Sequence, residues 1–388
     1  MGFNWLSEPS GDYYTRHFVP TPEAEGDRLI LNLGPQHPST HGVLRVVVEL
    51  DGEYIMKAEP VLGYIHRMQE KMGEVKTWRQ YLPNMGRVDY LHALAWNWAY
   101  VGAVERLAGI EVPARAEYIR VITCELNRIS SHLLWWGAYL LDLGAFTPIL
   151  YAFADRERIM DILQTVTGSR LTYCYYRFGG VSADLDESFI RATRQFLAQF
   201  KTRIPMFHDL VTGNMILRGR CEQIGVLPLE MAQRYGATGP VLRGSGLAYD
   251  TRRAEPYSVY PALDFQAPVG VNGDAMDRYD VRLAEMTQSI AIIEQALEAL
   301  PDGPFINPDL PERLTPPPGE VYFAVEGGRG KIGMHILSDG GPRPYRVKLR
   351  SPSFCNLQLF AELAQGTLLA DAVSILGSLD LVIPEIDR

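Results

Sequence analysis

The first regular hydrophobic pattern in the chain is typical of β strands. Two strand-like runs, residues 44–50 (LRVVVEL) and 53–61 (EYIMKAEPV), flank Asp51-Gly52. A D-G turn between such runs is a strong hairpin signal. Residues 1–28 show no period and mix Gly, Pro, aromatic and charged residues, which predicts an extended arm. We therefore expect a small N-terminal β-hairpin sheet within residues 29–62.

Helical periodicity dominates residues 63–315, and this part is expected to form a helical bundle domain. Helices are predicted at 64–80, 88–107, 113–143, 148–167, 186–209, 228–235 and 274–300, with Gly-rich connectors such as 236–246. After the prolines at 316–318, strand patterns return at 321–327, 331–337 and 345–350, followed by short helices at 354–363 and 369–376. Residues 316–388 are thus an α+β part, and the whole chain is predicted to be α+β.

Composition restricts the possible partners and cofactors. The 388 residues are 47% hydrophobic and 21% charged, which is enough to bury a sizeable core. Thirty-seven Lys and Arg stand against 46 Asp and Glu, without a basic block, which argues against nucleic acid as the main partner. The four cysteines show no C-x-x-C spacing. An iron–sulfur or zinc site built from this chain's own thiolates is therefore not expected.

One apolar segment approaches the length of a membrane span. Residues 133–154 are mostly apolar, but Asp142, Gly144 and Pro148 interrupt them. We interpret the segment as two buried helices that meet at a break, and we expect a cytoplasmic chain, because residues 1–10 lack the apolar core of a signal peptide. An aspartate in such surroundings is costly unless it is paired or functional. Asp142 is therefore a candidate site residue.

A glycine motif near residue 330 suggests a nucleotide site at first sight. Gly328, Gly330 and Gly333 fit G-x-G-x-x-G, but a dinucleotide fingerprint needs a helix after the glycines. The residues that follow are a strand pattern. A hairpin turn is therefore the favoured interpretation.

The histidines of the segment GPQHPSTHG, His37 and His41, are four residues apart. The neighbouring prolines disfavour the helix that a zinc-binding pair would need, and the glutamate of H-E-x-x-H is missing. A rigid loop that holds an imidazole in a fixed place is one interpretation. A histidine that only makes a turn hydrogen bond is the alternative.

Several other polar residues lie among apolar neighbours. Glu125, Arg128 and His132 fall on one face of a predicted helix, and a buried structural ion pair is the favoured interpretation. Tyr90 is predicted to begin a helix rich in aromatic residues, which more often indicates core than a cofactor site. Arg67 and Arg177 are ordinary on their own. The residues alone therefore name no reaction.

About ten collinear motifs together carry a resemblance. They include LNLGPQHPSTHGVLR, GYIHRMQEK, RVDYLH, IRVITCELNRISSHL, LLDLGAFTP, GDAMDRYDVRLAEM and SDGGPRPYRVKLRSPSF, in order from about residue 29 to 388. In these motifs the chain resembles the D-type subunit family of NADH:quinone oxidoreductase, respiratory complex I, whose mitochondrial member is the 49 kDa subunit. The resemblance implies a fold like that of nickel–iron hydrogenase large subunits. Those proteins bind metal through two C-x-x-C pairs, which this chain lacks, so the hydrogenase alternative is disfavoured.

The resemblance implies specific site residues and partners. The family's quinone headgroup ligands match His41 and Tyr90, and the carboxylate paired with the histidine matches Asp142. Arginines that face a terminal iron–sulfur cluster in the neighbouring B-type subunit match Arg67 and Arg177. The chain is expected to bind no metal or other cofactor itself, to contact the B-type and C-type subunits and the membrane arm, and to lie peripherally on the cytoplasmic face of the inner membrane. A subunit that keeps only a structural role is the alternative.

The sequence also departs from the family pattern. Met68 stands where members commonly have glycine, Thr172 where they usually have a histidine near the cluster, and Pro384 where they usually have glycine. The segment 304–318 is shortened. These departures concern the contact with the cluster and one surface helix.

Overall fold

The N-terminal sheet has three antiparallel strands rather than the two of the predicted hairpin. The structure is a computed structural model, and it describes residues 28–35 and 42–388. The strands are β1 (Arg28–Leu33), β2 (Arg45–Asp51) and β3 (Tyr54–Val61), in the order β1-β2-β3. Asp51 pairs with Tyr54 across the expected D-G turn. Alternate residues of β2, Val46, Val48 and Leu50, are buried, as expected of a sheet with one covered face.

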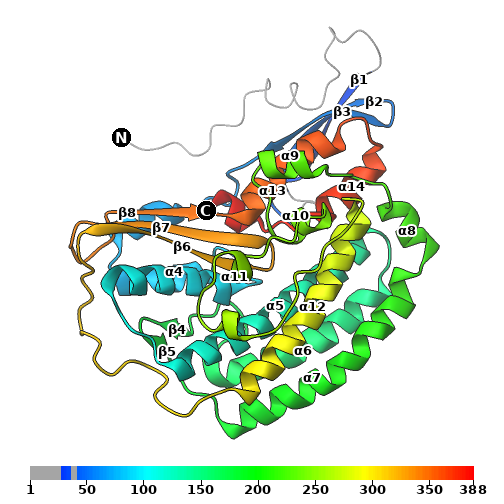
Figure 1. Cartoon of the computed structure of the whole chain (residues 1–388). Helices are drawn as coiled ribbons and strands as arrows, with labels where there is room; N and C mark the ends of the chain where they lie inside the picture. The colour runs from blue at the N-terminus through cyan, green and yellow to red at the C-terminus, as the bar shows by residue number, and fades with distance from the viewer. Residues whose placement is uncertain (1–27, 36–41) are drawn as a thin grey trace, which may run out of the picture.

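Long helices form the body of the molecule (Figure 1). α5 (Ala114–Asp142), α6 (Thr147–Thr167), α7 (Glu187–Phe207) and α12 (Ala275–Glu298) lie alongside one another. Shorter elements accompany them: α2 (Gln69–Val75), α3 (Trp78–Met85), α4 (Ala93–Ala108), β4 (Tyr176–Arg177), β5 (Gly180–Val181), the π-helical turn η2 (His208–Thr212), α8 (Met215–Cys221), α9 (Leu229–Arg234), α10 (Gly239–Gly244), α11 (Thr251–Ala254) and η3 (Tyr260–Ala262). The predicted α+β fold is confirmed.

The C-terminal part combines a second three-stranded sheet with three short helices. β6 (Gly319–Gly327), β7 (Gly330–Ser338) and β8 (Arg346–Arg350) form an antiparallel sheet. Gly328 and Arg329 make the two-residue turn between β6 and β7, so the hairpin interpretation of the glycine motif is confirmed. The chain ends with α13 (Pro352–Ala364), α14 (Leu369–Ser378) and α15 (Ile383–Asp387).

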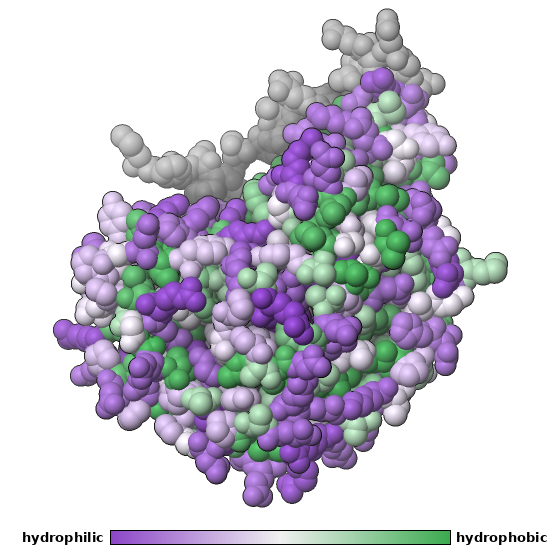
Figure 2. Space-filling model, in the orientation of Figure 1, coloured by the Kyte–Doolittle hydropathy of each residue, from purple (hydrophilic) through white to green (hydrophobic). Residues whose placement is uncertain are grey.

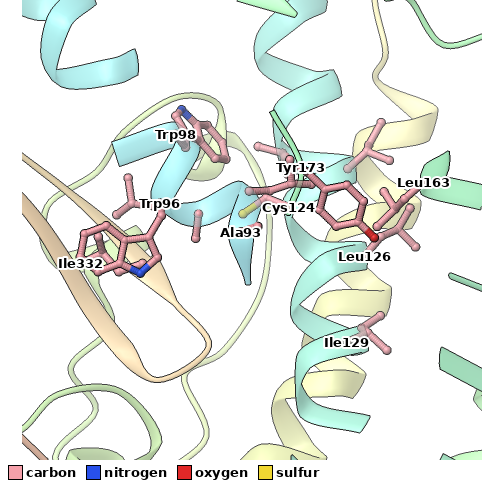
Figure 3. Packing of buried hydrophobic residues seen from close by; sticks show 14 of the residues in the cluster. Ala93, Trp96, Trp98, Cys124, Leu126, Ile129, Leu163, Tyr173 and Ile332 are labelled. Carbon is pink, nitrogen blue, oxygen red and sulfur yellow. The ribbon is translucent and has the colours of Figure 1, made fainter. Parts of the chain in front are cut away.

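Two groups of buried apolar residues hold these parts together. The larger joins the long helices, α4 and β6–β8; Figure 3 shows Trp96 of α4, Leu126 of α5 and Ile332 of β7 within it. The second joins the N-terminal sheet to α9, α10 and α13–α15. The two ends of the described chain therefore share a core. The division of the chain into an arm and three domains stays a prediction.

Some predicted elements differ from the structure. The helix predicted at 64–80 is two helices, α2 and α3, with Pro83 inside α3. Tyr90 does not begin a helix, because α4 starts three residues later at Ala93. The connector predicted at 236–246 contains α10, which begins at Gly239 with Pro240 in its first turn, where proline is tolerated. Each error lies at a Gly or Pro residue or at a helix end, where hydrophobic periodicity is short.

No helix of the described residues is both long and apolar enough to cross a bilayer. The apolar segment at 133–154 instead splits into the end of α5 and the start of α6, as predicted. Hydrophilic residues cover much of the face seen in Figure 2, with apolar residues between them.

Candidate functional site

Tyr90 stands at the surface just before α4. Its side chain is 37% exposed. The preceding residue, Asp89, is buried, and its Oδ1 accepts hydrogen bonds from the backbone N–H groups of Leu91 (2.9 Å) and His92 (3.1 Å). These bonds lie just ahead of Ala93, the first residue of α4, and hold the backbone on both sides of Tyr90. Burial, and after it the charge of Asp89, raises the pKa of Tyr90, so its hydroxyl stays protonated near neutral pH.

A buried cluster of charges lies beside Tyr90. The guanidinium of Arg329, at the β6–β7 turn, donates to Asp89 Oδ2 at 3.1 Å and to Ser131 Oγ at 2.7 Å. It also donates to Asp380 Oδ1 at 3.3 Å, and Asp380 Oδ2 lies 3.7 Å from Arg282 Nε. The charged side chains of this Asp89 cluster are at most 4% exposed. Buried charges are tolerated only when they are paired. The cluster is therefore a fixed, charged support beside the tyrosine.

Glu385 of α15 adds a protonated carboxyl group to this cluster. The side chain is fully buried, and Ser353 Oγ donates to its Oε2. Burial, together with the charge of Asp89, raises the pKa of Glu385 to about 8. The carboxyl is therefore mostly neutral at pH 7. Sequence reasoning missed it, because a glutamate in a short C-terminal run gives no pattern of its own.

The polar stripe on α5 belongs to a second buried network. Glu125 binds Arg128 at 3.0 Å, as the ion-pair interpretation predicted, and also Arg252 at 3.0 Å. Burial alone would raise the pKa of Glu125, but the two guanidinium groups outweigh it and lower the pKa. His132 pairs instead with Glu285 of α12, at 2.8 Å. The Glu125–Arg252 pair joins α5 to α11 and the His132–Glu285 pair joins it to α12, which is a structural role.

His92 is a buried imidazole that the sequence did not single out. Its Nδ1 accepts a hydrogen bond from Gly328 N at 2.8 Å, and its Nε2 lies 3.1 Å from the carbonyl oxygen of Cys124. The ring is therefore the tautomer that carries its proton on Nε2. Burial and the charge of Arg128 hold the pKa of His92 well below its ordinary value. The ring stays neutral and ties α4 to α5 and to the β6–β7 turn.

Asp142 is the last residue of α5 and is half-buried. A carboxylate at a helix C-terminus faces the negative end of the helix dipole, so this position is unfavourable without compensation. Leu140 and Leu143, on either side in sequence, line an apolar cavity of about 410 Å³ that α8 and the start of α6 complete. The break in the apolar segment thus places Asp142 beside this cavity.

The two candidate arginines lie in different surroundings. Arg67 is exposed, between β3 and α2, and its guanidinium makes no hydrogen bond or ion pair with the described residues. Arg177, in β4, is half-buried and donates to Cys174 Sγ at 2.9 Å. Among the described residues, no hydrogen bond or ion pair joins Tyr90, Arg67 and Arg177 directly.

The C-terminal segment contacts both the charged cluster beside Tyr90 and the backbone of Arg67. Asp380 is one of the charges that act on Tyr90, and the Glu385 carboxyl adjoins the same cluster, while the carbonyl oxygen of Arg388 accepts from Arg67 N at 3.4 Å. His41 lies outside the described residues. The described residues contain no group of three or more His, Cys, Asp or Glu side chains arranged to hold a metal ion.

Comparison with known proteins places the chain in the respiratory-chain oxidoreductases. The family described as "Respiratory-chain NADH dehydrogenase, 49 Kd subunit" matches residues 142–316 and 309–388. The chain belongs to this family, and the resemblance seen in its motifs is confirmed.

Relatives match the chain over nearly its whole length. The D-type subunit of NADH-quinone oxidoreductase from Syntrophobacter fumaroxidans is 60% identical over 92% of this chain and 96% of its own. The second D-type subunit of the same oxidoreductase from Opitutus terrae is 57% identical over 94% of this chain and 92% of its own. The D-type subunit from Desulfotalea psychrophila is 55% identical over 96% of this chain and 100% of its own.

Proposed function

We propose that the chain is the quinone-site subunit of a proton-translocating NADH-quinone oxidoreductase. In this proposal Tyr90 and His41 bind the quinone headgroup, Asp142 is the partner of His41, and Arg67 and Arg177 face an iron–sulfur cluster of the B-type subunit. The chain also contacts the C-type subunit and the membrane arm. It lies peripherally, on the cytoplasmic face of the inner membrane.

One observation carries the proposal: a partly exposed tyrosine stands beside a buried cluster of ion-paired charges. Buried polar groups such as Glu125 and Glu285 form ion pairs that hold the helices together. Tyr90 differs, because the backbone beside it is held by Asp89 while the residue is 37% exposed. A binding site needs a hydrogen-bond donor on a rigid support to orient a carbonyl oxygen of the quinone.

The chemistry requires donors of this kind. Reduction of a quinone to a quinol takes two electrons and two protons, and one proton goes to each carbonyl oxygen. The raised pKa of Tyr90 keeps the hydroxyl a donor until charge develops on the oxygen. In the proposal His41 serves the other carbonyl, and a carboxylate at Asp142 would stabilise the protonated imidazole. The electrons come from the partner's cluster.

Replacement of Tyr90 by phenylalanine tests the headgroup role. The change keeps the ring and deletes one hydroxyl, so we expect kcat/KM for a short-chain quinone to fall roughly tenfold to hundredfold. Electron transfer from NADH to an artificial acceptor that reacts upstream of the quinone should be unchanged. Tyr345→Phe, at a tyrosine that is 66% exposed, is the matched control. An equal loss of both activities in Tyr90→Phe would indicate damaged assembly and defeat the proposal.

A further inference from the structure

The loop between β3 and α2, which presents Arg67, rests on the side chain of Asp387. Gly63 N donates to Asp387 Oδ1 at 3.0 Å, and Ile65 N donates to Asp387 Oδ2 at 2.9 Å. Both carboxylate oxygens are therefore used on one short stretch of backbone. Bonds from N–H groups to an ionised carboxylate are stronger than neutral ones.

The main chain of the last two residues completes the contact. His66 Nδ1 lies 2.7 Å from the carbonyl oxygen of Asp387, and Arg67 N donates to the carbonyl oxygen of Arg388 at 3.4 Å. Within the loop itself, His66 N donates to Gly63 O at 3.3 Å. The C-terminus thus supplies most of the polar contacts of the described loop.

The C-terminal segment is itself firmly packed, so it can support the loop. Ile383 and Ile386 of α15 are 2% and 1% exposed within the second core. The Arg388 side chain donates to Leu349 O at 2.9 Å and lies over the ring of Phe354, 4.7 Å from its centroid. The position of the exposed loop between β3 and α2 is therefore fixed by α15, which is more than 300 residues away in sequence.

We infer that Asp387 is a positioning residue whose carboxylate, with the main chain of Arg388, fixes the loop that presents Arg67. The inference deepens the proposed function, because it rests on Arg67 facing a partner's cluster. It also explains how the Arg67 loop and the charged cluster beside Tyr90 are held in a fixed relative position. The short helix α15 carries Asp387 toward the Arg67 loop and Glu385 toward the charges beside Tyr90.

Amide hydrogen exchange in the assembled complex tests the contact without using activity. In Asp387→Ala we expect the amides of Gly63 and Ile65 to exchange about tenfold faster or more, because both lose their acceptor. The control is Glu362→Ala, which removes an exposed carboxylate of α13 that binds Tyr235, and it should leave this loop unchanged. Unchanged exchange in assembled Asp387→Ala would overturn the inference.

A second variant keeps the test decisive if Asp387→Ala does not assemble. Asp387→Asn preserves the shape of the side chain but leaves a single acceptor oxygen. Exchange should then rise at one of the two amides, Gly63 or Ile65, and much less at the other. Equal, native-like protection of both amides would overturn the inference.

The cluster's paramagnetic resonance signal and reduction potential test the consequence for Arg67. Asp387→Ala should change them in the same direction as Arg67→Met, and the double variant should equal Arg67→Met alone. Additive effects would show that Asp387 does not act through Arg67 and would overturn that part. If Arg67→Met leaves the signal unchanged while exchange still rises in Asp387→Ala, the proposed cluster contact fails and the positioning of the loop stands.

Discussion

Arg329 and Asp89 form a buried ion pair at 3.1 Å, and Asp89 is the direct sequence neighbour of Tyr90. Arg329 comes from a hairpin turn 240 residues later in the chain. The pair therefore joins the start of α4 to the C-terminal sheet at the point where the candidate donor reaches the surface. This arrangement makes the stability of the fold and the geometry of the site depend on the same residues.

Removal of Arg329 should be costly for folding. Arg329→Leu leaves the buried carboxylates Asp89 and Asp380 without their shared cation, and breaking a buried pair in this way costs about 3–5 kcal/mol. Thermal unfolding of the purified chain measures the loss. Arg346→Leu is the control, because Arg346 pairs with Glu70 and Glu74 while 46% exposed, and such pairs contribute about 1 kcal/mol or less. Equal effects of the two substitutions would contradict this account of the cluster.

Glu385 should make stability fall as pH rises. The pKa is about 8 in the folded chain, against an ordinary value of 4.5. Between these values the unfolded chain has lost a proton that the folded chain still holds, so stability is full below about pH 4.5 and declines toward pH 8. Each pKa unit corresponds to about 1.4 kcal/mol.

The variant Glu385→Gln removes this titration. Relative to the unmodified chain, the variant should therefore be more stable at pH 8 than at pH 5, with a larger free energy of unfolding. Denaturant unfolding at the two pH values measures the difference. The exposed Glu362→Gln should show no such trend, and a pH-independent difference for Glu385→Gln would show that the buried carboxyl does not titrate as described.

The sequence was sufficient for the long elements and insufficient for the site. Helices such as α5 and α12 follow from period alone, and the D-G turn and the β6–β7 turn follow from local chemistry. The long-range bonds of Asp89 and Asp387 do not. They join residues more than 200 positions apart, and single acidic residues carry no information about distant partners. His92 and Glu385 stayed hidden for the same reason.

The roles of the site residues came from the motifs and not from physical reasoning. Glu125 and His132 looked as promising as Tyr90 by spacing, and the structure assigns both to buried pairs. The resemblance selected Tyr90 and Arg67 instead, and it gave a role to Asp142, which its apolar surroundings had already made a candidate. The structure adds that Asp89 holds the backbone beside Tyr90 and that the C-terminal segment holds the backbone around Arg67.

Met68 offers a test of a departure from the family. It has φ of 52°, in the left-handed region, and its side chain is 58% exposed. A residue with a Cβ is less favourable there than glycine by about 1–2 kcal/mol, and the added flexibility of unfolded glycine offsets part of this. Met68→Gly should therefore raise the free energy of unfolding by up to about 1 kcal/mol. Met215→Gly, at an 85% exposed position that begins α8, should not raise it.

Asp142 is where the charge of the proposed site can be removed with little change in shape. In Asp142→Asn the headgroup contacts of Tyr90 and His41 remain possible, but the negative charge that would favour a protonated imidazole is lost. We therefore expect quinone turnover to fall about tenfold to hundredfold with a smaller change in KM. The same substitution at the exposed Asp302 should leave both constants unchanged. Turnover should also recover partly at lower pH, where imidazole protonation needs less help, and a purely structural defect would show no such recovery. An Asp142→Asn complex with full turnover at neutral pH would remove this carboxylate from the proton-transfer role, even though it ends the helix beside the cavity.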